Sequence, residues 1–208
     1  MESVGNAGYL PPKSLLAIIW TTFSVAFLFV VMRTAIRFKI VKRLATEDYW
    51  MFLALATLLT NSILQTIQLP SLYYMSAVTT GVIPISVELI SVGDNYLRFE
   101  FAIIVLFWTI LWCVKASFLA LYYKLFQDMP MYRFAWYILA TFTLCAYIGC
   151  WITALTTCHP ISNFFKFAQC NTAADVWASR MSVYYSTVID IFTDLCSKCV
   201  REMTLGRC

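Results

Sequence analysis

The sequence predicts an all-α protein, a polytopic bundle of transmembrane helices, and three observations support that prediction. The chain has 208 residues, of which 61% are hydrophobic and 12% are charged, whereas an ordinary soluble domain carries roughly 25% charged residues. Long uncharged apolar runs alternate with short loops. Four of these runs are long enough to cross a hydrocarbon core of about 30 Å, which needs about 20 residues. Since a bilayer accounts for this composition, the net charge of +4 does not indicate a nucleic-acid partner.

The first two helices have clear boundaries. We expect the first at about 14–36, after Pro11-Pro12, because prolines suit a helix start. We expect the second at about 48–69, where Glu47 and Asp48 place carboxylates at the positive end of the helix dipole. Pro70 predicts its end. The stretch 72–95, broken by glycines and a proline, is interpreted as an external loop with at most a short surface helix.

The remaining helices are expected at about 99–126, 133–156 and 176–196. The third carries Lys115 within its apolar run, and the fifth carries Arg180, Asp190 and Asp194. The chain is thereby divided into an extracellular N-terminal tail at 1–13, a transmembrane domain at 14–196 and a cytoplasmic tail at 197–208.

Basic residues alternate between the two sides of the predicted membrane. One side collects ten Lys and Arg residues and the other four. The positive-inside rule then places the N-terminus outside and the C-terminus in the cytoplasm. The richest segment is the first cytoplasmic loop, for which a signalling protein or anionic lipid is the expected partner. Its basic residues are Arg33, Arg37, Lys39, Lys42 and Arg43.

Several short blocks, in a fixed order, resemble one known family. They include Glu47-Asp48-Tyr49-Trp50-Met51, then Lys115-Ala116-Ser117-Phe118-Leu119, then Cys158-His159-Pro160, and finally Phe192-Thr193-Asp194-Leu195. Together these blocks resemble the fungal rhodopsin-domain integral membrane proteins, a receptor-like family that includes the satratoxin-cluster membrane proteins.

The resemblance implies a seven-helix architecture, of which this sequence holds five helices. After Leu195 the chain becomes polar and ends at Cys208. We therefore expect a C-terminally truncated member of the family, arising from truncation, splicing or the gene model.

Charged residues inside a span are costly and mark functional candidates. Asp190 and Asp194 are four residues apart and share a helix face. If the fifth helix begins near Arg180, Asp194 reaches about the depth of Lys115, and the three residues form an intramembrane polar group. The alternatives are that Lys115 extends to the inner interface or that the fifth segment inserts poorly.

The cysteines divide by compartment. Cys158 and Cys170 fall in one external loop, where the family pattern and an oxidising environment favour a disulfide. Cys196, Cys199 and Cys208 lack a fourth ligand for zinc, since His159 lies across the membrane.

The function classes that remain are not enzymatic. The sequence contains no Gly-x-Ser-x-Gly, His-Glu-x-x-His or Walker motif, and we expect no metal and no cofactor, retinal included. The leading hypothesis is a receptor-like multi-pass protein of the plasma membrane or an endomembrane that senses an extracellular ligand. The alternatives are a transporter or scaffold component and a truncated product without independent activity. An oligomer is a further possible state of the protein. The sequence identifies neither the ligand nor the pathway.

Overall fold

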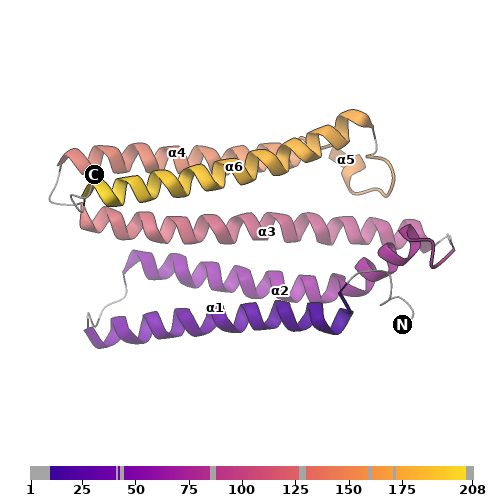
Figure 1. The fold of residues 1–208 in the computed structure, drawn as a ribbon, viewed down its shortest axis with the longest axis horizontal. Coiled ribbons are helices and arrows are strands. Elements are labelled where there is room, and N and C mark those ends of the chain that lie inside the picture. The colour runs from indigo at the N-terminus through magenta and orange to yellow at the C-terminus, as the bar shows by residue number, and fades with distance from the viewer. Residues whose placement is uncertain are drawn as a thin grey trace.

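The computed structural model describes residues 10–40, 42, 45–84, 88–126, 130–158, 161–170 and 172–204, and these are almost entirely helical, with no strand. The order of helices is visible in Figure 1. They are α1 (Pro12–Ile40), α2 (Thr46–Thr79), α3 (Glu88–Leu125), α4 (Pro130–Leu155), the short α5 (Ile161–Phe164) and α6 (Ala173–Thr204). The predicted all-α bundle is confirmed.

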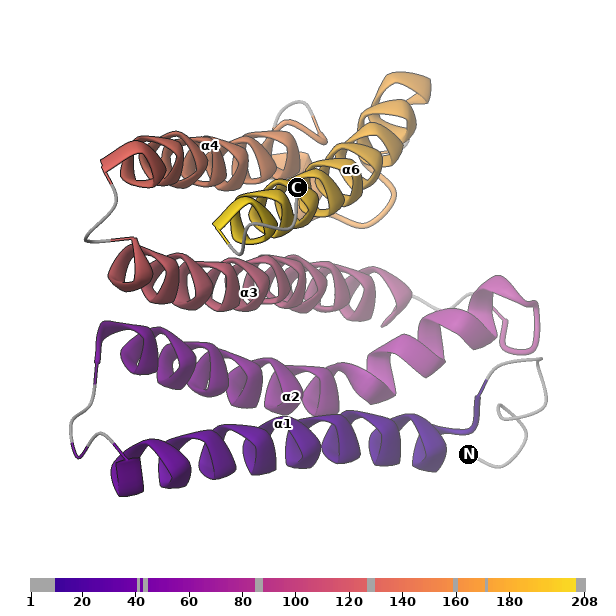
Figure 2. The same ribbon diagram turned by 60° about the vertical axis from the view of Figure 1, so that its left-hand side comes forward.

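The helices are arranged in three layers with α3 in the middle. The α1–α2 pair lies on one side of α3, and the α4–α6 pair lies on the other (Figures 1 and 2). The most extensive contacts join α2 to α3. α1 is the most peripheral of the long helices, since Val30 is its one buried residue among those described. α3 is therefore the element through which the two halves of the bundle meet.

The two ends of the bundle differ in content. One end of the bundle, called the basic end below, is where α1, α3 and α6 end and where α2 and α4 begin (Figure 1). The opposite end carries the turn between α2 and α3, α5, and the Cys158–Cys170 bridge, and is called the disulfide end below. The up-and-down order of the helices fixes this alternation, because successive connections fall at opposite ends.

Four helices of the described chain are long and apolar enough to cross a membrane, namely α1, α2, α3 and the Tyr132–Leu155 part of α4. Their outward side chains are apolar and exposed, for example Leu28 and Phe29. A bilayer solvates such a surface, and water does not. α6, expected as the fifth span at 176–196, runs beside α4 (Figures 1 and 2) but is not among the four, because charges interrupt it.

The predicted end of the second helix at 69 and start of the third at 99 are wrong. Pro70 lies inside α2, because a proline removes a single backbone hydrogen bond and a helix can continue past it with a bend. Figure 2 shows α2 changing direction along its length. The interpretation of 72–95 as an external loop is likewise wrong, since α3 already begins at Glu88. The turn between them uses Gly81, whose φ of 75° suits glycine.

α6 also exceeds its predicted bounds of 176–196 at both ends, and it continues through the polar residues after Leu195 to Thr204. The expected bounds of α1 and α4, 14–36 and 133–156, differ from those observed by a few residues, as helix ends commonly do.

Two clusters of buried side chains hold α3, α4 and α6 together. One contains Trp112, Ala146 and Cys150, with Ile189 of α6 packed against them. The other, nearer the basic end, contains Phe126 and Leu139 and includes Cys196 of α6 at its edge. These contacts fix the rotation of α6 about its axis and thereby decide where its two carboxylates lie.

Candidate functional site

Lys115 of α3 lies between the two aspartates of α6. Its Nζ is 2.7 Å from Oδ1 of Asp190 and 2.9 Å from Oδ1 of Asp194. The ammonium also donates to Thr193 Oγ1 at 2.5 Å and to the Asp190 carbonyl oxygen at 2.9 Å. It lies 5.1 Å from the centre of the Trp112 ring, within cation–π range. Positions 190, 193 and 194 share one face of α6 through the helical repeat.

This group of Lys115, Asp190 and Asp194, called the lysine cluster below, is unbalanced in charge and in burial. It contains one cation and two carboxylates, so its formal charge is −1. The Lys115 side chain is 12% exposed and that of Asp190 26%, whereas the Asp194 side chain is 57% exposed. A buried ion pair needs compensating partners for both members. Asp190 meets Lys115 on the inside of the bundle, while Asp194 presents more than half of its side chain to the surroundings.

The depth of the lysine cluster follows from α4. The rings of Phe192 and Phe142 lie 5.6 Å apart, and Phe142 stands eight residues inside the uncharged run that begins at Phe134. Eight residues correspond to about 12 Å of helix. The cluster therefore lies in the half of the bundle nearer the basic end, at a depth that the uncharged run of α4 still covers.

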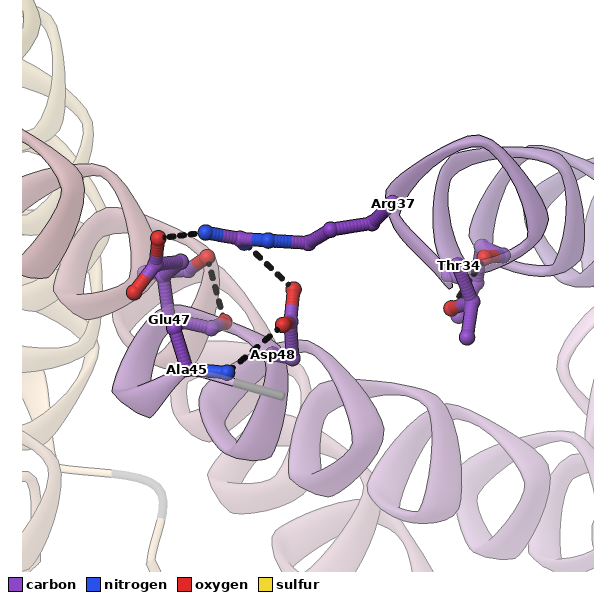
Figure 3. A network of polar contacts seen from close by, with 7 residues as sticks. Thr34, Arg37, Ala45, Glu47 and Asp48 are labelled. Carbon is purple, nitrogen blue, oxygen red and sulfur yellow. Dashed lines mark hydrogen bonds and ion pairs between the residues drawn. The ribbon is translucent and has the colours of Figure 1, made fainter. Parts of the chain in front are cut away.

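A second ionic group lies on the other side of α3. Arg37, near the end of α1, forms ion pairs with Glu47 and, at 2.7 Å, with Asp48 in the first turn of α2 (Figure 3). Both carboxylates are buried. Asp48 also accepts a hydrogen bond from the Ala45 N–H at 3.0 Å, and the Glu47 carbonyl accepts one from Ser117 Oγ of α3 at 2.9 Å. This arginine cluster ties α1, α2 and α3 together at the basic end.

Sequence reasoning did not find the arginine cluster. It assigned Arg37 to a basic loop and the two carboxylates to the start of a helix. The available signal was the placement of opposite charges ten and eleven residues apart in the sequence, on either side of the boundary between the first two helices.

The predicted basic loop lies partly on a helix. Arg33, Arg37 and Lys39 lie on α1, which extends to Ile40, so the loop itself is shorter than expected. Lys39 and Lys42 are exposed and Arg33 is half-buried. Arg43 lies outside the described residues. Within the described chain, Arg37 is thus committed to the arginine cluster, whereas Lys39 and Lys42 of the predicted loop are exposed, as are Lys124 of α3 and Lys198 of α6 at the same end.

The disulfide end is closed by a short docked segment. Cys158 and Cys170 are joined by a disulfide, with their Cα atoms 5.8 Å apart. The segment between them contacts the start of α3: Asp94 Oδ1 accepts a hydrogen bond from the Phe167 N–H at 2.6 Å. A Cβ added at Gly93 would lie 2.6 Å from the Phe167 ring, so this close approach requires glycine. His159 lies outside the described residues.

At the same end of the bundle, a hollow of about 440 Å³ opens between α1, α2 and α3. Its walls are mainly apolar, with hydroxyl groups from Ser76, Thr79 and two tyrosines. The lining residues are Leu10, Leu15, Leu72, Tyr73, Met75, Ser76, Thr79 and Tyr96. One helical turn further along α3, Glu100 accepts a hydrogen bond from Gln68 of α2 at 2.7 Å, which fixes one wall of the hollow.

The fold and these groups define a multi-pass membrane helix bundle with ion pairs inside it. Residues 32–199 match the family model of the fungal rhodopsin domain, and the chain therefore belongs to that family. No curated protein and no solved structure matches the chain.

Proposed function

We propose that this chain is receptor-like: it takes a small, largely apolar ligand in the hollow at the disulfide end and passes its occupancy to the basic end through α3. The observation that carries the proposal is the continuity of α3, whose 38 residues include Tyr96 in the wall of the hollow and both contact points of the ionic clusters. A helix that long is stiff on the scale of the bundle. A ligand that displaces its start therefore acts on Lys115 and Ser117 as well.

The chemistry of the hollow defines the ligand class. Apolar side chains make up most of its lining, and the polar groups are uncharged hydroxyls. Such a surface favours a neutral, mostly apolar molecule with a hydrogen-bonding head group. We assign the chain no catalytic activity, because the sequence carries none of the hydrolase, protease or nucleotide-binding motifs named above.

The orientation we propose has the disulfide end outside and the basic end in the cytoplasm. A disulfide suits an oxidising compartment. The exposed Lys39 and Lys42 would then face the anionic lipids of the cytoplasmic leaflet, which attract basic residues by about 1 kcal/mol each.

The test is photolabelling of the protein in phosphatidylcholine nanodiscs with a diazirine-bearing long-chain alcohol. We expect labelling of the peptide around 72–79 and its loss in Ser76→Phe, which fills the hollow. Ala178→Phe is the matched control, because it fills a different hollow between α4 and α6. Spin labels at Ile40 and Leu125, exposed at the basic end, should change their separation when the alcohol binds. Labelling that Ser76→Phe leaves unchanged would argue against the proposal.

Transport is the second candidate function. Pro70 inside α2 and the charged lysine cluster are features that transporters use, because broken helices and membrane-embedded charges line ion paths. Proton flux into liposomes loaded with a pH-sensitive dye distinguishes the two: a transporter should give flux that Lys115→Met abolishes, and a receptor should give none.

A further inference from the structure

The outward surface of α6 carries a carboxylate that the bundle only partly covers, since the Asp194 side chain is 57% exposed. Asp194 belongs to a stripe of α6 that also contains Val183, Thr187 and Asp190, spaced by three or four residues and therefore aligned along the helix. We call it the α6 stripe. Asp194 pairs with Lys115, which it shares with Asp190. Within the described chain no second cation pairs with it.

The opposite side of the bundle carries a cation at the same depth. Arg33 is the first charge after the uncharged run 14–32 of α1, and it makes no ion pair with any described residue. It borders a hollow of about 540 Å³ on the outer surface of α1 and α2. The other lining residues are Phe29, Met32, Ile36, Arg37, Ile40 and Met51.

The depths of Arg33 and Asp194 can be compared through Glu47, which contacts both Arg37 and Ser117. Arg33 lies four residues from Arg37 toward the disulfide end, or about 6 Å along α1. Lys115, which contacts Asp194, lies two residues from Ser117 in the same direction, or about 3 Å along α3. The two charges therefore differ in depth by about 3 Å, well within the reach of an arginine side chain.

We propose that the chain associates with a second copy of itself in the membrane, head to tail, with Asp194 on the α6 stripe of one copy paired with Arg33 at the α1 hollow of the next. The pairing brings a second cation to a cluster whose formal charge is −1, and it removes an unpaired cation and a half-exposed carboxylate from contact with lipid, where each is costly. Because α1 and α6 lie on opposite sides of the bundle (Figures 1 and 2), successive copies form a ring or a row.

Symmetry argues against a two-fold dimer in which the α6 stripes of two copies face each other. Two copies that share an orientation in the membrane can be related by a two-fold axis only if that axis runs along the membrane normal, which keeps equivalent residues at equal depth. Pairing through the α6 stripe in this way would set Asp194 beside Asp194, and adjacent like charges repel. The contact between α6 and α1 avoids this conflict because it joins different surfaces.

The test is complementation between two variants that each lack one partner of the pair. Full-length protein is labelled with donor or acceptor dyes and reconstituted in phosphatidylcholine liposomes, and energy transfer reports association. We expect Arg33→Gln and Asp194→Asn each to associate at least tenfold more weakly than the unmodified protein. An equal mixture of the two should regain energy transfer between unlike chains, since Arg33→Gln still offers Asp194 and Asp194→Asn still offers Arg33.

Controls separate this contact from a folding defect. Lys39→Gln removes an exposed cation from the same helix and should leave association unchanged, and Arg33→Lys should retain most of it. Asp194→Glu keeps the charge and serves if Asp194→Asn fails to fold. A mixture no stronger than its separate components, or association that none of these substitutions weakens, would overturn the proposal. A third result would also overturn the proposal: the protein does not associate with itself but binds an added model helix of leucine and alanine with one central lysine. That result would indicate a partner other than a second copy of the chain.

Discussion

Lys115 and Ser117 lie two residues apart on α3 and bind on opposite sides of that helix. Lys115 pairs with Asp190 and Asp194 of α6, and Ser117 donates to the Glu47 carbonyl at the start of α2. Two residues correspond to about 200° of rotation and about 3 Å of rise. The lysine cluster and the arginine cluster therefore hold the same level of α3 from its two sides. A rotation of α3 that loosens one contact also disturbs the other.

Removing the lysine should destabilise the bundle. Lys115→Met leaves Asp190 and Asp194 without their cation, and breaking a buried pair typically costs about 3–5 kcal/mol. We expect about 3 kcal/mol, because Asp194 is partly exposed. Thermal unfolding in detergent measures the loss. The triple variant with Asp190→Asn and Asp194→Asn should recover most of it, and a fully stable Lys115→Met would contradict the pairing.

Arg37 should matter more than its neighbour Arg33 for the stability of a single chain. Arg37→Gln leaves two buried carboxylates, Glu47 and Asp48, without a cation, at an expected cost of about 3–5 kcal/mol. Arg33→Gln is the matched control, with an expected change within about 0.5 kcal/mol in dilute detergent. Equal effects of the two substitutions would show that Arg37 has no special role.

Gly93→Ala tests how the segment between Cys158 and Cys170 docks on α3. The added methyl group would overlap the Phe167 ring, and overpacking of this kind costs about 1–3 kcal/mol. Limited proteolysis should cut the segment faster in the variant. Combining Gly93→Ala with Phe167→Ala should relieve the overlap, and the prediction fails if the single variant resists protease as the unmodified protein does.

The Cys158–Cys170 bridge should be recovered as one linked fragment by non-reducing peptide mapping. Replacing both cysteines with serine should lower stability by about 3 kcal/mol, the value that the chain-entropy relation gives for a loop of this size. Free, alkylatable thiols at both positions in freshly isolated membranes would refute the bridge.

The orientation can be measured by labelling single introduced cysteines on intact cells. Position 13, at the start of α1, should react with a membrane-impermeant maleimide, and position 40, which is exposed at its end, should react only after permeabilisation. Reaction at position 40 in intact cells would reverse the proposed topology.

The sequence alone determined the fold class, because the requirement that a spanning helix satisfy its own backbone hydrogen bonds leaves a direct trace in length and apolarity. It also identified Lys115, Asp190 and Asp194, since ionised groups are rare inside apolar runs. Proline and glycine were less reliable indicators of helix ends, as Pro70 inside α2 shows, because neighbouring contacts can stabilise a helix through a lost hydrogen bond.

Only the tertiary structure decided which charges meet. The pairing of Arg37 with Glu47 and Asp48 depends on the packing of the end of α1 against the start of α2. The division of Lys115 between two carboxylates depends on the rotation of α6, which is set by the packing of Ile189 and Cys196 against α3 and α4. Periodicity places a residue on a face of its own helix. Which helix lies against that face is fixed by side-chain packing between helices distant in sequence, and a single sequence does not encode that packing in a local pattern.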